Sequence, residues 1–399
     1  MTSSDQTLPT FQEFFSRALP ANGTGNTLSL GENHQASEHW QWLQQHLPEL
    51  IKNHQLTTIG IESPAFFTLL FCAYKDKTLE DRLGGKEQAR NYLRAVLLST
   101  VPANTQKSMS AQADFIMEAL DSGLEVIAYD GRDSWQGWQH AWSKEIQEFR
   151  QNLQQIVRND DLSASQQTWR TNPSFLDAIA QGKPERKIPW VIDEMDWLFR
   201  QQPHYQKTLS AIESLISCGQ EKIAVGRLTH DALSATLFNT MAKAEGNRIT
   251  VGGVMHIDGV GDKDAQAHGT FGHHLSKIGG ESSGHRVTHA ILAGPVVQHM
   301  HKNRMAQAAN QPKVRNHDLT ALHLGSGTEE TLRHNDGEPL TKLFSVDTLL
   351  PREVARKFKS SERAAFVRSH VNPLLMPDIK TAADALRAAM NPEEQGRPR

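Results

Sequence analysis

The stretch TLSLGENHQASEHWQWLQQHLPELI, residues 27–51, contains the pattern on which the fold prediction depends. Residues 27–30 form a short apolar run that ends at Gly31, which is typical of a buried parallel strand. Helical spacing follows over 37–51, where the apolar face consists of Trp40, Leu43, Leu47 and Leu50. A strand followed by a helix is the repeating unit of an α/β fold.

The same alternation continues along the chain. Further apolar runs bounded by turn residues predict strands at 56–61, 124–129, 222–225, 248–251 and 286–292. Helical patterns occupy 110–122 and 231–244, and Gly123 and Gly246 stand where helices commonly stop. We therefore expect an α/β fold with a mostly parallel central sheet flanked by helices.

Two regions interrupt this alternation. The first, 133–220, is polar and predicts a helical insertion; its helically spaced Trp135, Trp138 and Trp142 indicate packing against the body, with a binding platform as the alternative. The second has helical patterns at 352–370 and 379–390, and it ends in a polar tail that we expect to be disordered. The predicted organisation is a polar leader at 1–26, an α/β core at 27–297 and a helical C-terminal extension at 298–399.

Composition excludes several classes of protein. The 399 residues carry a net charge of −3, which argues against nucleic acid as the main partner. No run approaches the roughly 18 apolar residues of a membrane span. Two cysteines, Cys72 and Cys218, exclude a disulfide scaffold and a cysteine-rich zinc module. The polar N-terminus has no Sec-type signal, so we expect a cytoplasmic protein or one secreted into a host cell by another route.

Ionisable residues follow several predicted strands. Ligands of open α/β sheets bind beyond the carboxyl ends of the strands, so these residues are candidates for one site. They are Glu32, His34, Glu62, Asp130, Arg132 and His256. A histidine beside a carboxylate can act as a general base on water, and an arginine can stabilise an oxyanion. We expect Gly31 and Gly253 to permit tight turns below the histidines.

Each motif also has a purely structural interpretation. Glu62 before Ser63 and Pro64 can begin a helix, and Asp130 before Gly131 is a good turn sequence. His39 is expected to be a surface residue of the first long helix rather than a ligand.

Histidine content supports a second hypothesis. The chain has 19 histidines, 11 of them between His256 and His334. Two histidines and a carboxylate can hold a divalent metal with an open position, and His34, Glu62 and His256 are the candidate ligands. Haem is the alternative cofactor, and a stoichiometric Soret band on haem addition is the measurement that tests it.

The order of these motifs resembles a known superfamily. Gly-Glu-Asn-His at 31–34, Ile-Glu-Ser-Pro at 61–64 and Gly-Val-Met-His at 253–256 are similar to motifs of the superfamily that joins ChaN-like haem-binding lipoproteins, erythromycin esterases, TraB proteins and Tiki proteases. The segment LSLGENHQASEHWQWL at 28–43 resembles the ChaN-like branch most closely, and Met241-Ala242 fits the Met-Ala pair that precedes the last motif in the family. No lipobox cysteine is present, and Leu237-Phe238-Asn239 replaces an Arg-Asn or Arg-Asp pair common in the family.

The resemblance implies an α/β core with a crevice that contains Glu32, His34, Glu62 and His256. It leads us to expect a hydrolase in which water activated by His34 or His256 attacks an ester, lactone or amide of a small-molecule or peptide substrate. Bacterial effectors and toxins also contain related domains, so action inside another cell is compatible with this activity. The alternative is a non-catalytic haem- or metal-binding protein.

Overall fold

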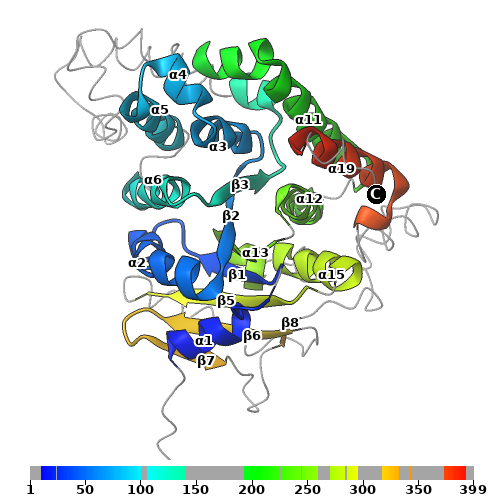
Figure 1. The fold of residues 1–399 in the computed structure, drawn as a ribbon. Helices are drawn as coiled ribbons and strands as arrows, with labels where there is room; N and C mark the ends of the chain where they lie inside the picture. Colours follow the sequence, from blue (N-terminus) through cyan, green and yellow to red (C-terminus); the bar gives the residue numbers. More distant parts are fainter. Residues whose placement is uncertain are drawn as a thin grey trace, which may run out of the picture.

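A central sheet organises the computed structural model of the chain (Figure 1). The structure describes residues 10–23, 25–99, 106–140, 193–223, 226–243, 245–258, 270–283, 285–294, 317–331, 341–342 and 373–391. The strands are β1 Thr27–Glu32, β2 Leu56–Pro64, β3 Glu125–Asp130, β4 Asn247–Gly253, β5 Val287–Ala293, β6 His317–His323, β7 Thr328–Thr331 and β8 Thr341–Lys342. Their order is β3-β2-β4-β1-β5-β6-β7, with β8 paired to β6.

The sheet is mostly parallel, which confirms the predicted fold class. Strands β1 to β6 pair in parallel, and β7 and β8 each run antiparallel to β6. β1 and β4 are buried along their whole length, because helices cover both faces of the sheet and leave no solvated side. This is why apolar runs, rather than alternating patterns, mark these strands in the sequence.

Helices lie on both faces of the sheet. Figure 1 shows α2 and α6 on one side and α12 and α15 on the other. The helices are α1 Phe11–Ala18, α2 Ser37–His54, α3 Phe67–Lys75, α4 Thr78–Leu83, α5 Lys86–Ser99, α6 Gln106–Asp121, η2 Trp197–Gln201, α11 Pro203–Lys222, α12 Gly226–Met241, α13 Met255–Asp258, α15 Phe271–Ser283, η3 Pro373–Leu375 and α19 Pro377–Met390. Among these described helices, none combines the length and the apolar character needed to cross a bilayer.

Local sequence explains the long helix α2. Its predicted apolar face is buried, and Pro48 lies inside the helix without ending it. The helix ends at Gln55, which has a left-handed backbone with φ of 48° and donates its N–H to Leu50 O. The helix before β3 ends as predicted at Gly123, where φ of 84° favours glycine.

The predicted strand at 222–225 is wrong for residues 222 and 223, and residues 224–225 lie outside the described part of the chain. Lys222 is the last residue of α11, and Ile223 caps that helix by donating its N–H to Gly219 O. The apolar pair Ile216 and Ile223 belongs to the buried side of this helical region instead. A short apolar run does not distinguish a strand from the end of a buried helix.

The C-terminal part contains both expected and unexpected elements. Helix α19 confirms the predicted helix at 379–390 and packs along α11. Strands β6, β7 and β8 lie in the region where we expected only helices, and they extend the sheet. The predicted helix at 352–370 and the predicted tail lie outside the described residues, as does Trp142.

The predicted packing of the tryptophan stripe is confirmed for two of its members. Trp135 and Trp138 are buried and stack at 5.5 Å between ring centroids. Phe66 packs edge-on against both rings, and Phe199 does so against Trp135. The two indole rings therefore form part of the core and are not an exposed platform.

The N-terminal helix α1 packs against β7, which lies at the opposite end of the strand order from β3. Thr10 caps α1 and forms an antiparallel bridge with Thr328 of β7. Phe11 donates its N–H to Gly327 O at 3.3 Å, and Arg17 forms an ion pair with Glu329 of β7. These contacts hold α1 against the edge of the sheet (Figure 1).

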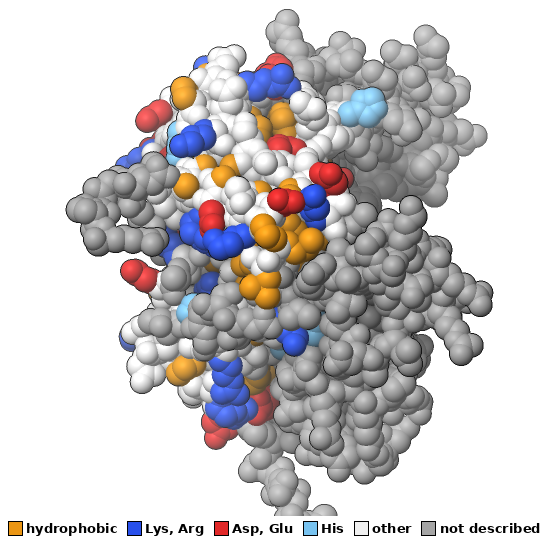
Figure 2. Space-filling model, turned by 90° about the vertical axis from the view of Figure 1, so that its right-hand side faces the viewer, with side chains coloured by type: hydrophobic (Ala, Val, Ile, Leu, Met, Phe, Trp, Pro, Cys, Tyr) orange, Lys and Arg blue, Asp and Glu red, His pale blue; other side chains and the backbone are white. Residues whose placement is uncertain are grey.

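Opposite charges are mixed on the described surface. Figure 2 shows Lys and Arg side chains interspersed with Asp and Glu over the described part of one face. Such mixing agrees with the small net charge of the chain.

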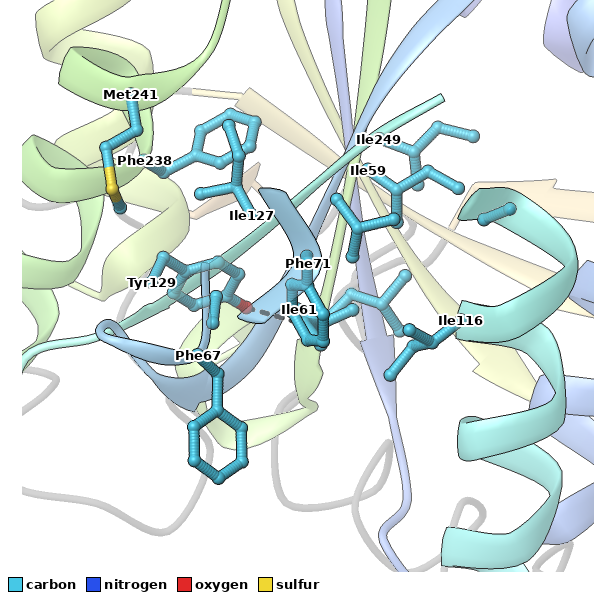
Figure 3. Close-up of a cluster of buried hydrophobic side chains, with 14 of the residues drawn as sticks. Ile59, Ile61, Phe67, Phe71, Ile116, Ile127, Tyr129, Phe238, Met241 and Ile249 are labelled. Atoms are coloured by element: carbon cyan, nitrogen blue, oxygen red, sulfur yellow. Dashed lines mark hydrogen bonds between the residues drawn. The ribbon is translucent and has the colours of Figure 1, made fainter. Parts of the chain in front are cut away.

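Buried side chains pack against both faces of strands β2, β3 and β4. Figure 3 shows Phe238 and Met241 of α12 on one side of the strands and Ile116 of α6 on the other. Phe238 is fully buried and lies edge-on to Tyr129 of β3 at 6.1 Å. Gly60 of β2 lies directly under the Phe238 ring, because a Cβ at this position would come within 2.6 Å of that ring.

We expect Phe238→Ala to lower the free energy of unfolding by about 3–5 kcal/mol, because the buried ring would leave a cavity against the sheet. Urea unfolding followed by circular dichroism measures this change. The matched control is Leu375→Ala, a side chain that is 66% exposed, for which we expect a change within about 0.5 kcal/mol. Equal effects of the two substitutions would contradict this packing.

Candidate functional site at the carboxyl ends of the strands

The sheet order brings the predicted site residues to one edge. Strand β4 lies between β1 and β2, and β3 is the next neighbour of β2. Glu32 and Asp130 are the last residues of β1 and β3, Glu62 lies near the end of β2, and His256 lies in the short helix that follows β4. Open α/β sheets bind their ligands beyond the carboxyl ends of the strands, so these residues lie where a ligand is expected.

Glu32 and His34 form a buried–exposed pair. The Glu32 carboxylate is almost fully buried, whereas the His34 side chain is 57% exposed. His34 Nδ1 contacts Glu32 Oε1 in an ion pair. This contact raises the pKa of His34 to about 9, against the lowering effect of partial burial, and burial raises the pKa of Glu32. Glu32 therefore holds the His34 ring through one ring nitrogen, Nδ1.

Glu62 accepts hydrogen bonds from three directions. The backbone N–H of Gly253 donates to Oε2 at 2.7 Å, and the Oε1 atom lies 3.1 Å from His256 Nε2 and 3.3 Å from Arg132 Nη2. Burial raises the pKa of Glu62, but the positive charges of His256 and His34 outweigh it and bring the pKa well below its ordinary value. Glu62 is therefore a stable carboxylate and a weak base.

His256 is held by carboxylates at both ring nitrogens. Nδ1 donates to Asp231 Oδ1 at 2.5 Å, and Nε2 faces Glu62. Burial lowers the pKa of His256, but the charges of Asp231 and Glu62 raise it to about 10. The ring is an imidazolium with both N–H groups engaged, so it has no lone pair with which to take a proton from water. Of the two histidines expected as bases, only His34 keeps this capacity.

Asp130 connects Arg132 to His230. Arg132 donates from its backbone N–H to Asp130 Oδ1 at 2.9 Å and from Nε to Oδ2 at 2.7 Å. His230 Nε2 lies 2.9 Å from Asp130 Oδ1. Burial raises the pKa of Asp130, but His230 and Arg132 together bring it to about 2. The Arg132 side chain remains 53% exposed and can reach a bound molecule.

The two glycines have a different role from the one expected. Gly31 and Gly253 lie inside β1 and β4, and neither has a positive φ. These glycines matter because they have no side chain, so neighbouring groups can approach the backbone closely. A Cβ on Gly253 would come within 2.9 Å of His34 Nε2 and 3.4 Å of Glu62 Oε2. The bare backbone at Gly253 lets the His34 ring approach the strand end beside Glu62.

Two residues of the site were not predicted from the sequence. His230 and Asp231 lie in the first turns of α12, and Asp231 was expected only as the start of a helix. Both side chains are buried, and the His230 and His256 rings meet edge-on at 5.0 Å. In the sequence, only the adjacent His-Asp pair at the start of a helix indicates them. The pair can be assigned to the site only when α12 is known to pack beside β3.

His39 is buried, so the expected surface position is wrong. Its Nδ1 accepts the backbone N–H of Asn33 at 3.0 Å, which fixes the loop between β1 and α2. His39 thereby supports the loop that carries His34.

The predicted metal ligands do not all converge. Among the described residues, two groups of three could hold a metal ion: His230, Asp231 and His256, and Glu62, Asp130 and His230. Each group offers ligand atoms within 4.8 Å of one another. His34 belongs to neither group.

Comparisons with known proteins give little further information. No protein-family model and no curated protein matches the sequence. One solved structure, a protein from Bacillus cereus, is similar with a TM-score of 0.37 and 14% sequence identity, over 71% of this chain and 69% of that chain.

We expect Asp231→Asn to lower the pKa of His256, because one of its two carboxylate partners loses its charge. The raised pKa of about 10 stabilises the fold fully below pH 6.5, the ordinary pKa, and this stability is lost as pH rises toward 10. NMR titration of the histidine rings measures the pKa.

Urea unfolding over the same pH range checks the linkage. The decline in the free energy of unfolding toward alkaline pH should be smaller in Asp231→Asn than in the unsubstituted protein, and His34, whose pKa is also raised, contributes to the decline that remains. The matched control is Asp384→Asn, on the exposed face of α19, which should leave the decline unchanged. An unaltered His256 pKa in Asp231→Asn would show that the pair does not form.

Proposed function

We propose that this protein is a hydrolase that activates water with His34. The observation that carries the proposal is the Glu32–His34 pair, in which a buried carboxylate holds one nitrogen of a half-exposed imidazole. This is the arrangement by which a carboxylate orients a histidine and stabilises its charged form during general base catalysis. The resemblance of the strand-end motifs to ChaN-like proteins, erythromycin esterases and Tiki proteases supports the same class of reaction.

The proposed reaction gives each of the ionisable groups one role. His34 Nε2 takes a proton from water as the oxygen attacks the carbonyl carbon of an ester, lactone or amide. The same nitrogen returns the proton to the leaving group. Arg132 stabilises the oxyanion, since its guanidinium is exposed and anchored on Asp130. Glu62 and His256 act as a fixed ion pair that positions Arg132 and the floor of the crevice.

The setting of this activity is a separate proposal. We infer that the protein acts in the cytoplasm or after transfer into another cell. A reporter fused to residues 1–50 tests transfer, and retention of the reporter in the producing cell would favour the cytoplasm.

We expect His34→Gln to reduce turnover by about 10²–10⁴-fold, the usual contribution of a positioned general base. A panel of 4-nitrophenyl esters, lactones and amide substrates measures kcat/KM at neutral and alkaline pH. The matched control is His46→Gln, a histidine that is also close to a glutamate, at 3.7 Å, but lies in α2 away from the strand ends. Full turnover in His34→Gln, or no turnover by the unsubstituted protein with any of the three classes, would contradict the proposal.

The pH profile distinguishes a base from a structural histidine. With a His34 pKa of about 9, kcat/KM should rise with pH until it levels off near that value, because only the neutral ring accepts a proton. Glu32→Gln removes the charge that raises this pKa, so we expect the profile to shift toward lower pH. A profile that keeps its position in Glu32→Gln would exclude Glu32 as the positioning residue of His34.

A further inference from the structure

Three elements bring metal-ligating atoms together outside the set expected from the sequence. Glu62 comes from β2, Asp130 from β3 and His230 from α12, and their ligand atoms lie within 4.8 Å of one another. His230 Nε2 and Asp130 Oδ1 are 2.9 Å apart. Two ligand atoms that share a tetrahedral zinc ion lie about 3.3 Å apart, since each bond is about 2.0–2.1 Å long. A small adjustment would thus suffice for both to bind one ion.

Two buried polar atoms next to this group lack hydrogen-bond partners. His230 Nε2 and Asp231 Oδ2 are both buried, and neither is hydrogen-bonded to any described residue. The 2.9 Å contact of His230 with Asp130 is close but is not aligned as a hydrogen bond. Buried polar atoms without partners are uncommon, and an absent ion is one of their ordinary explanations.

The second nitrogen of His230 also has suitable surroundings. Asp231 Oδ1 lies 3.8 Å from His230 Nδ1. Metal-bound histidines commonly present their other ring nitrogen to a carboxylate, which keeps the ligating nitrogen deprotonated. Asp231 therefore occupies the place of such a carboxylate, and a shift of less than an ångström would make it a hydrogen bond.

The balance of charges among these side chains favours a further cation. Four carboxylates with little solvent exposure lie at this site: Glu32, Glu62 and Asp130 at the strand ends, and Asp231 in α12. The Arg132 guanidinium and the protonated His34 and His256 rings offset three of these four negative charges. Arg132 touches both Glu62 and Asp130, the two carboxylates of the convergent group. Its half-exposed side chain can swing into solvent and vacate that position.

We propose that Glu62, Asp130 and His230 form a binding site for a divalent transition-metal ion. A mixed set of one imidazole nitrogen and two carboxylates suits Zn²⁺ or Mn²⁺ better than Mg²⁺ or Ca²⁺, which favour oxygen ligands alone. The ion and the Arg132 guanidinium compete for the same two carboxylates. The other convergent group, His230, Asp231 and His256, is closed by the 2.5 Å hydrogen bond between Asp231 and His256.

This site shares Glu62, Asp130 and Arg132 with the proposed hydrolysis, but the two proposals are tested by different measurements. Binding of an ion is measured directly, so a failure to bind leaves the His34 mechanism intact, with Arg132 as the charged group. A failure to hydrolyse any substrate leaves the metal site intact. The two proposals can therefore be rejected separately.

Equilibrium dialysis and titration calorimetry of the untagged full chain with ZnCl₂ or MnCl₂ test the site. We expect one ion per chain in the unsubstituted protein and loss of that ion in His230→Gln. Arg132→Gln should bind the ion at least about tenfold more tightly, because a competing positive charge beside the ligands is gone. Glu49→Gln is the matched control, since it removes a surface carboxylate next to a histidine and should not alter binding.

Each result decides the question. Weaker binding in His230→Gln together with tighter binding in Arg132→Gln supports the site. Equal binding in all four proteins overturns it, because the ion then binds elsewhere on this histidine-rich chain. Absence of binding in both the unsubstituted protein and Arg132→Gln also overturns it. The Arg132→Gln arm keeps the test decisive if circular dichroism shows that His230→Gln does not fold, since a gain of affinity requires a folded site.

Discussion

The Glu62 carboxylate is the constraint on which the strand-end site depends. It is buried at the end of β2 and stays charged because a backbone N–H, an imidazolium and a guanidinium all face it. An uncompensated charge at this depth would cost several kcal/mol, so its partners must be present whenever the fold is formed. Glu62 therefore connects β4, α13 and the loop after β3, and their relative positions fix where His34 and Arg132 stand. The arrangement of the site residues and the stability of this end of the sheet depend on the same ion pairs.

The sequence predicts the central sheet well, because five of its strands are buried on both faces and appear as apolar runs. Strands β6 to β8 were not predicted, because polar residues interrupt the apolar ones in β6, HDLTALH, and the four residues of β7, TEET, are all polar. The run at 222–225 was misleading because Lys222 ends α11 and the buried Ile223 caps that helix. The sequence also indicated most of the strand-end residues, because parallel strands bring their ends to one edge. His230 and Asp231 could not be placed, since their position depends on how α12 packs beside β3, a property of tertiary structure.

The two histidines of the similar Gly-x-x-His motifs have different surroundings, although the sequence presents them alike. His34 has one buried carboxylate partner and one side open, whereas His256 lies between two carboxylates. The difference comes from neighbours that are remote in sequence, Asp231 for His256 and the bare backbone of Gly253 for His34. One histidine is thus suited to exchange a proton and the other to carry a permanent charge. A motif identifies a residue type at a place, and the charges around it determine what the residue can do.

The contacts of α1 with β7 have a consequence for association between molecules. A short strand at the border of a sheet exposes backbone groups that can pair with another chain. In this fold Thr10 and Phe11 occupy part of that border, and Arg17 adds a charge paired with Glu329. The N-terminal helix therefore covers part of this sheet edge, and cleavage between α1 and β1 is expected to expose backbone groups of β7 that could pair with another chain.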